Sequence, residues 1–212
     1  MNDIDLSRHL GMVDRTVGLR EHLGRPARVV TAHRTYTTAI DDLWDALTNA
    51  ERIPRWFLPI TGDLRLGGHY QLEGNAGGEI TQCEPPRLLA ITWVFGPEPS
   101  WVNVELTALA SESTRLQLEH VAHVPDEFWD QFGPGAVGVG WDLALMGLAE
   151  HLAGAPPMDR AAAEQWPTTE RGREYVAYCS REWCQASIAA GTEASAAKAA
   201  ADRTTSFYTG AG

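Results

Sequence analysis

Residues 132–152, FGPGAVGVGWDLALMGLAEHL, place Gly133, Gly135 and Gly138 at the G-x-G-x-x-G spacing of dinucleotide-binding loops. Such a loop must follow a strand, open a helix and be followed about 20 residues later by an acidic residue that ends a second strand. Here the preceding segment DEFWDQ has helical character, and the position about 20 residues on falls among prolines beyond a helix end. The glycines therefore predict no nucleotide cofactor.

The same stretch instead predicts a long helix over residues 135–153. Pro134 suits the first turn of that helix, and Gly154 with Pro156 and Pro157 ends it. We expect the small residues at positions 135, 136, 138 and 140 to let the helix approach a sheet closely, or to loosen its first turns so that a ligand can enter. The apolar stripe that recurs at helical spacing consists of Val137, Trp141, Leu145, Leu148 and Leu152.

Upstream of this helix the pattern is that of an antiparallel sheet. Residues 27–38 and several short runs between closely spaced turn signals in residues 60–124 have strand character. In residues 101–110, WVNVELTALA, apolar and polar side chains alternate, and in residues 114–122 Leu116, Leu118 and His120 share one face. Residues 41–57 between the first two strands show helical periodicity, interrupted at Pro54. The order predicts an α+β fold in which a curved sheet of about six or seven strands grips one long helix.

The two ends of the chain are predicted to be helical. We expect residues 1–26 to form an N-terminal helical segment, because Ile4, Leu6, Leu10 and Val13 are spaced as on a helix. Residues 27–157 would form the sheet-and-helix domain. Residues 158–212 predict a helical extension that packs on this domain or on a second subunit, which would make a homodimer.

Composition limits the function. With 28 acidic and 17 basic residues the formal charge is −11, which argues against nucleic acid as a partner. The N-terminus is polar, and the longest apolar run, near LLAITWVF, is too short to span a bilayer, so we expect a cytoplasmic protein without membrane insertion. Three cysteines without a C-x-x-C pair predict reduced thiols and no zinc site. His120 and His123 should point to opposite faces of a strand, which disfavours a shared metal.

Four segments together carry a resemblance to a known family: residues 41–74, residues 77–93 (GGEITQCEPPRLLAITW), the strand ending in LEH, and residues 132–152. Over residues 27–153 the chain resembles the SRPBCC or START-like superfamily, whose members have the helix-grip fold. Within that superfamily it more closely resembles the bacterial proteins grouped with the C-terminal domain of the activator of the Hsp90 ATPase. The resemblance implies a tendency to bind apolar molecules, since lipid and hormone carriers, polyketide cyclases and self-sacrificing antibiotic resistance proteins share this fold.

The resemblance also implies a pocket among the second helical piece, the central strand and the long helix. We therefore expect a hydrophobic small molecule, such as a lipid or polyketide, to be bound there without any cofactor or metal. An enzyme acting on that ligand, a cyclase or hydrolase using His120, is one alternative, and an Hsp90-activator-like protein interaction module is another. The expected ligand-binding residues are Trp56, Phe57, Trp93, His120, Trp129, Phe132, Trp141 and Leu145.

His120 has two interpretations at this point. Its ring nitrogens can be satisfied by neighbouring protein groups in a purely structural role, or its ring can project into the pocket and orient the ligand. In both cases burial on an apolar strand face predicts a neutral imidazole at pH 7.

Overall fold

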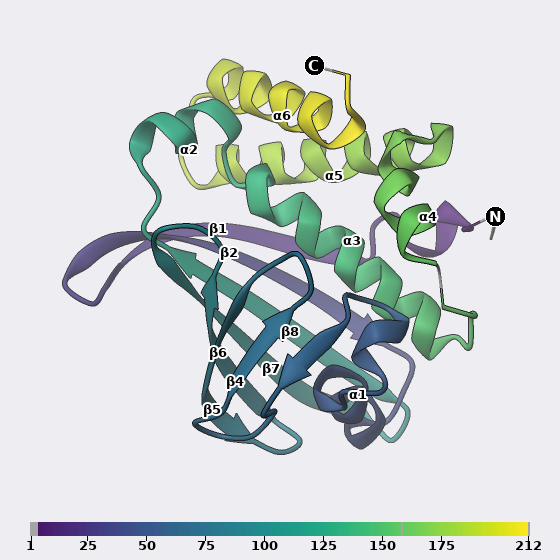
Figure 1. Ribbon diagram of the computed structural model, residues 1–212. Coiled ribbons are helices and arrows are strands. Elements are labelled where there is room, and N and C mark those ends of the chain that lie inside the picture. Colours follow the sequence, from purple (N-terminus) through teal and green to yellow (C-terminus); the bar gives the residue numbers. More distant parts are fainter. Residues whose placement is uncertain (1–3, 158, 212) are drawn as a thin grey trace.

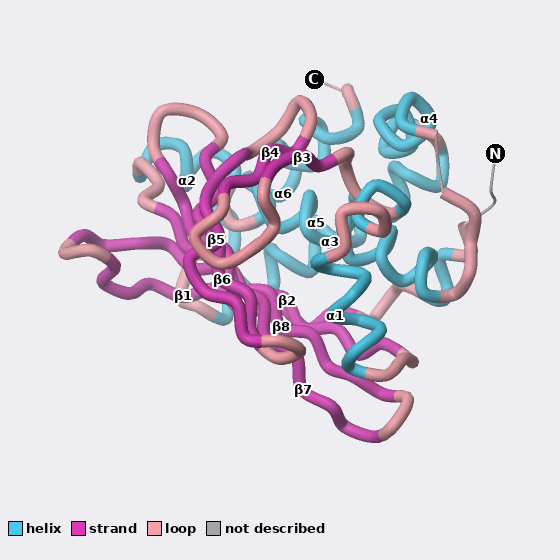
Figure 2. Tube along the Cα trace, turned by 60° about the horizontal axis from the view of Figure 1, so that its bottom comes forward, coloured by secondary structure: helices cyan, strands magenta, loops and turns pink. Residues whose placement is uncertain are grey.

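The computed structural model describes residues 4–157 and 159–211, which fold into one curved antiparallel sheet with the helices gathered on one face (Figures 1 and 2). The sheet has eight strands in the order β1-β2-β8-β7-β6-β5-β4-β3. The α+β helix-grip fold predicted from the sequence is confirmed. The strands are β1 (Val13–His22), β2 (Arg25–Tyr36), β3 (Ile60–Gly62), β4 (His69–Leu72), β5 (Gly77–Glu84), β6 (Leu88–Val94), β7 (Pro99–Ala110) and β8 (Ser113–Ala122).

Most of the helices follow the sheet in the sequence. The α-helices are α1 (Ile40–Thr48), α2 (Asp126–Phe132), α3 (Gly135–Leu152), α4 (Arg160–Gln165), α5 (Glu170–Ala189) and α6 (Ala194–Thr209). Three short 3₁₀ helices complete the described elements: η1 (Leu6–Arg8), η2 (Ile53–Arg55) and η3 (Trp166–Thr168).

The N-terminal helical segment predicted for residues 1–26 is wrong for residues 13–22, which form strand β1. Residues 1–3 of that prediction lie outside the described residues, and within residues 4–26 only η1 is helical. β1 pairs with β2 along its whole length through a turn in which Leu23 and Gly24 both have positive φ, 51° and 74°. Positive φ at both central residues is the mark of a tight β-hairpin. Long-range pairing thus overrides the local helical spacing, and the sheet has eight strands rather than six or seven.

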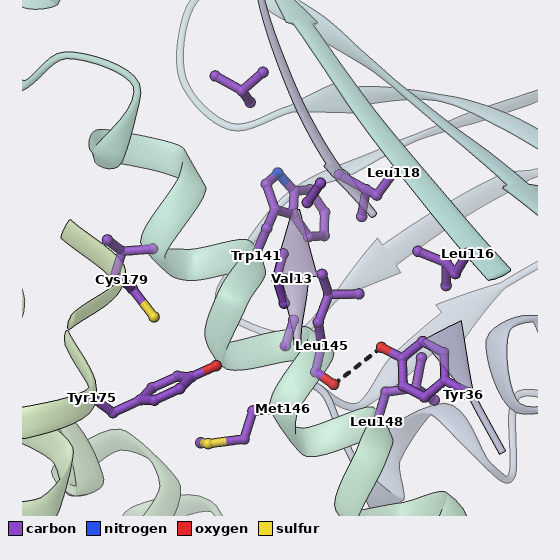
Figure 3. Close-up of a cluster of buried hydrophobic side chains, with 14 of the residues drawn as sticks. Val13, Tyr36, Leu116, Leu118, Trp141, Leu145, Met146, Leu148, Tyr175 and Cys179 are labelled. Atoms are coloured by element: carbon purple, nitrogen blue, oxygen red, sulfur yellow. Dashed lines mark hydrogen bonds between the residues drawn. The ribbon is translucent and has the colours of Figure 1, made fainter. Parts of the chain in front are cut away.

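Helix α3 lies between the sheet and the C-terminal helices, so it is buried on two sides (Figure 3). Toward the sheet it directs Trp141 and Leu145, near Leu118 of β8. On the other side Tyr175 and Cys179 of α5 approach it. A helix covered on both sides needs apolar residues around most of its circumference, which explains why α3 carries so few charged residues.

The small residues at the start of α3 lie against the C-terminal helices and not against the sheet. This finding corrects the prediction that they let α3 approach the sheet closely. A Cβ atom placed on Gly138 would overlap the indole ring of Trp183 on α5. Cβ atoms on Gly135 and Gly140 would come within 3.1 Å and 3.0 Å of side-chain atoms of Thr204 and Tyr208 on α6. The glycines therefore permit the close approach of the C-terminal extension to α3.

Gly138→Ala is expected to lower the free energy of unfolding by about 1–3 kcal/mol, as overpacking of a filled interior does. The loss should appear even though alanine is the better helix former, because Trp183 is 1% exposed and its indole ring is held in place by the hydrogen bond to Asp142. Urea unfolding followed by circular dichroism measures the change. Gly140→Ala, which meets only one hydroxyl group, is the comparison and should cost less; a Gly138→Ala protein as stable as wild type would refute the packing argument.

The C-terminal extension and strand β1 meet at a buried ion pair. Asp142 of α3 is fully buried, and the guanidinium of Arg15 from β1 donates to both carboxylate oxygens at 3.0–3.2 Å. The indole N–H of Trp183 on α5 donates to Asp142 Oδ2 at 2.9 Å. The carboxylate of Asp142 thereby joins the first strand, the long helix and the extension in one network.

Candidate functional site

A cavity of about 330 Å³ lies between the sheet, α1, the η2 region and α3, and it is partly open to solvent. Its walls are almost entirely apolar. Helix α3 contributes Trp141, and the strands contribute the opposite wall. The lining residues are Trp44, Leu47, Thr48, Ile53, Trp56, Phe57, Ile60, Leu64, Tyr70, Leu72, Ile80, Cys83, Pro85, Leu89, Ile91, Trp93, Val102, Val104, Leu118 and Trp141.

Four of the expected ligand-binding residues line this cavity together: Trp56, Phe57, Trp93 and Trp141. The rings of Trp56 and Phe57 stack with centroids 5.4 Å apart, and the ring of Phe57 stacks in turn on that of Trp141 at 6.5 Å. Trp93 meets Trp141 edge to face at 5.0 Å. Offset and edge-to-face pairs of this kind hold aromatic side chains in fixed orientations. The result is a preorganised aromatic wall.

The other expected ligand-binding residues lie outside this cavity. Leu145 is buried in the core below it, where its carbonyl oxygen accepts a hydrogen bond from the Tyr36 hydroxyl at 3.1 Å (Figure 3). Trp129 and Phe132 line a different cavity, because α2 is bent by 57° from α3 and leads away from the sheet. His120 lies behind the aromatic wall and is absent from the cavity lining.

His120 sits in the middle of the inner sheet face, opposite Val30 of β2 and Val102 of β7. The indole N–H of Trp141 donates to His120 Nδ1 at 3.0 Å. Because an indole N–H can only donate, Nδ1 is the unprotonated acceptor, and Nε2 carries the proton. His120 Nε2 therefore donates to Ser100 Oγ, 2.8 Å away.

The chain of hydrogen bonds continues from Ser100, whose hydroxyl donates to the carbonyl oxygen of Trp93 at 3.0 Å. Every polar atom of the His120 ring is thus satisfied within the protein. Burial lowers the pKa of His120 to about 4, so the ring is neutral at pH 7. The geometry favours the structural interpretation, in which His120 orients the Trp141 side chain through a hydrogen bond and packs edge to face against the Trp93 ring, with centroids 6.3 Å apart.

Most polar groups of the cavity lining are also engaged by the protein. Trp56 Nε1 donates to the Ala46 carbonyl at 3.0 Å, and the Tyr70 hydroxyl donates to the Thr92 carbonyl at 2.8 Å. Burial raises the pKa of Tyr70, which keeps its hydroxyl neutral. Among the described residues, the indole N–H groups of Trp44 and Trp93, which both line the cavity, make no hydrogen bond to the protein. These two N–H groups are the indole donors left to a molecule in the cavity.

The strand residues that form the opposite wall were not among the ligand-binding residues predicted from the sequence. Val102, Val104 and Leu118 line the cavity and share the inner face of β7 and β8. The alternation in residues 101–110 and 114–122 already places them on one face, so strand parity could have found them. Tyr70, in the short strand β4, and Ile80, in β5, which begins with two glycines, carry no comparable signal.

The described residues show neither a metal cluster nor a single membrane-spanning helix. Among residues 4–157 and 159–211, no three His, Cys, Asp or Glu side chains are grouped to hold a metal ion. His123 lies on the outer side of the sheet from His120, with its ring near Trp101. Within the same ranges, no single helix is long and apolar enough to cross a bilayer, and only the bent pair α2 and α3 reaches that length and composition together.

Comparison with known proteins places these features in a family. The family model described as activator of Hsp90 ATPase homolog 1-like protein matches residues 37–153, more than half of the 212 residues. The chain belongs to this family. A comparison with curated proteins found no significant match.

Solved structures agree with membership of the activator of Hsp90 ATPase homolog 1-like family. The chain is 32% identical to CalU16 from Micromonospora echinospora in its solution structure, with a TM-score of 0.69 over 85% of this chain and 98% of that chain. The crystal structure of CalU16 gives 30% identity and a TM-score of 0.66 over 85% and 99% of the two chains. PFC0360w, an HSP90 activator from Plasmodium falciparum, is 22% identical with a TM-score of 0.50 over 69% and 99%, a likeness that shows the fold alone.

Proposed function

We propose that this protein binds a hydrophobic small molecule in the cavity between the sheet and α3. The observation that carries the proposal is the aromatic wall of Trp56, Phe57, Trp93 and Trp141 facing apolar strand residues across about 330 Å³. Concave, mostly apolar sites with few polar groups are typical of small-molecule binding. The fold of the family, which commonly binds apolar ligands, supports the same function.

The size and the polar groups of the cavity narrow the ligand class. A volume near 330 Å³ is at the lower end of small-molecule sites, which span about 300–1,000 Å³. Such a volume suits a compact ring compound of the polyketide kind better than an extended lipid chain. The indole N–H groups of Trp44 and Trp93, which have no partner among the described residues, favour a ligand that carries a hydrogen-bond acceptor among its apolar atoms.

Filling the cavity is expected to abolish binding without unfolding the protein. Ile91 lines the cavity from β6, and Ile91→Trp should weaken the binding of the neutral probe N-phenyl-1-naphthylamine at least tenfold by occupying its space. Energy transfer from tryptophan to the bound probe measures affinity. Leu109→Trp, which adds the same ring at a position 56% exposed on β7, is the matched control and should bind like wild type.

Two results would contradict this proposal. The first is a wild-type protein that fails to bind the probe or any member of a panel of ring compounds and fatty acids. The second is equal probe affinity in the Ile91→Trp and Leu109→Trp proteins, since the probe would then occupy some other surface.

The geometry around His120 argues against the alternative function, an enzyme that uses His120 in catalysis. His120 is 6% exposed, lies outside the cavity lining and has both ring nitrogens engaged by Ser100 and Trp141. A general acid or base must reach the proton that it transfers.

The second alternative is a protein interaction module, which membership of the activator of Hsp90 ATPase family suggests. Hsp90 would then be retained on the immobilised protein, and the Ile91→Trp substitution would not affect that retention. This result would favour the interaction module over small-molecule binding.

A further inference from the structure

A second cavity lies on the opposite side of α3 from the proposed ligand cavity, enclosed by α2, the first residues of α3, α5 and α6. Its volume is about 320 Å³. Small side chains of α6 leave the space open, and aromatic rings from α2 and α5 border it. The lining residues are Trp129, Asp130, Phe132, Gly133, Pro134, Gly135, Ser180, Trp183, Cys184, Ser187, Thr192, Ala196, Ala197, Ala200 and Ala201.

The walls of this second cavity are fixed by hydrogen bonds between α2 and α6. Arg203 Nε and Nη2 donate to the carbonyl oxygens of Gln131 and Asp130 at 2.6 Å and 3.1 Å. Thr204 Oγ1 donates to the carbonyl oxygen of Phe132 at 2.9 Å. These bonds occupy the last carbonyl groups of α2 and hold that helix against α6. The cavity is therefore bounded by anchored elements on either side.

One polar side chain in this cavity lacks a partner. Ser180 of α5 is 1% exposed and lines the cavity, and its Oγ makes no hydrogen bond within the described part of the chain. A buried hydroxyl without a partner costs about 1–3 kcal/mol. By contrast, the hydroxyl of Ser187, which also lines the cavity, donates to Thr192 Oγ1 at 2.8 Å. Thr192, which also lines the cavity, accepts that bond, so Ser180 is the lining hydroxyl that has no hydrogen bond at all among the described residues.

The start of α3 offers a second source of donors at the same cavity. Residues Gly133, Pro134 and Gly135 line it and are buried, and no side chain caps the N-terminus of α3. The first N–H groups of a helix have no partner within the helix and carry partial positive charge. In α3 the N–H of Ala136 already donates to the Gly133 carbonyl at 3.4 Å, and the N–H of Gly135 together with the Ser180 hydroxyl favours a ligand with a hydrogen-bond acceptor.

The charges around the cavity favour an uncharged acceptor. Among the described lining residues, Asp130 is the charged one, and none is basic. A carboxylate ligand would meet like charge and find no counterion, whereas a carbonyl oxygen avoids that cost. We propose that this cavity is a second binding site, for a small, uncharged and largely apolar molecule whose carbonyl oxygen accepts a hydrogen bond from Ser180. Half of its walls come from α5 and α6, beyond the residues 37–153 that match the family model.

A matched pair of probes tests the carbonyl recognition. Acetophenone and ethylbenzene have similar shape, and only the first carries a carbonyl group. Titration of each into the ¹⁵N-labelled full-length protein, read from the indole N–H signals of Trp129 and Trp183, reports on this cavity, while those of Trp56 and Trp93 report on the other. Acetophenone should shift the signals of Trp129 and Trp183 and bind more tightly than ethylbenzene. Benzoate should bind more weakly than acetophenone.

Two substitutions sharpen the test. Ser180→Ala should weaken acetophenone binding about tenfold, the loss of one buried hydrogen bond, and leave ethylbenzene binding unchanged. Ala197→Leu should fill the cavity and remove binding of both probes, whereas Ala194→Leu, at an exposed position that starts α6, should not. Equal losses for the two probes in Ser180→Ala would overturn the carbonyl assignment. If no probe shifts the Trp129 and Trp183 signals, and the Ala197→Leu protein is more stable than wild type, the cavity is a packing void and not a binding site.

Discussion

Asp142→Ala is expected to lower the free energy of unfolding by roughly 3–5 kcal/mol, because it leaves the buried guanidinium of Arg15 without its counterion. The Arg15 side chain is 4% exposed and cannot turn to water while β1 stays paired. Trp183 also loses the acceptor of its indole N–H. Chemical denaturation followed by circular dichroism measures the loss.

A double-mutant cycle separates the cost of an unpaired charge from the value of the pair. The combination Arg15→Met with Asp142→Leu removes both charges, and it should lose much less stability than the sum of the two single substitutions. Glu119→Gln, which breaks the more exposed pair with Arg20, is the control and should cost less than about 1 kcal/mol. An Asp142→Ala protein no less stable than Glu119→Gln would mean that the network does not hold the extension.

Stability should fall by about 3 kcal/mol as the pH is lowered from 6.5 to 4, owing to His120 alone. The pKa of His120 is about 4 in the folded protein and near the ordinary 6.5 in the unfolded chain. Between these values the unfolded chain binds a proton that the folded protein does not, so acid favours unfolding. Above pH 6.5 both states are neutral and the full contribution is present. Protonation would also require Nδ1 to give up its hydrogen bond from Trp141.

His120→Gln removes the titrating group and isolates this contribution from those of other residues. At pH 7 the variant should be less stable than wild type, and the difference should shrink by about 3 kcal/mol as the pH falls to 4. Denaturant midpoints at several pH values give the comparison. His69→Gln, at an exposed position of β4, should follow the wild-type curve. Parallel curves for wild type and His120→Gln would show that His120 is not desolvated in the folded protein.

The parts of the fold that sequence reasoning predicted are those with strong local periodicity. The alternation in residues 101–110 and 114–122 gives β7 and β8, and the stripe from Val137 to Leu152 gives α3. Strand β1 was not predicted because buried and exposed side chains alternate only in its first residues, and its conformation depends on pairing with β2. Pairing partners are not encoded in local spacing.

The residues of the candidate site, too, were predictable only in part from the sequence. The resemblance placed Trp56, Trp93 and Trp141 at one cavity, and strand parity placed His120 on the inner face of the sheet. Trp129 was misplaced because its position depends on the bend between α2 and α3, which no periodicity records. The unpartnered Ser180 could not be found at all, since a missing hydrogen bond is a property of the packed structure.

Strands β1 and β2 are synthesised first, but several of their contacts are with elements that are synthesised much later. Arg15 lies 127 positions before Asp142 and 164 positions before Cys179, and β2 pairs with β8. A ribosome adding about 5–20 residues per second needs on the order of ten seconds to make that much chain. Throughout that interval the β1–β2 hairpin is exposed, and Arg15, which is buried in the folded protein, remains in water. Contacts of such long sequence separation also slow folding after release, so the nascent hairpin is the stage at which this chain is most open to aggregation and to chaperones.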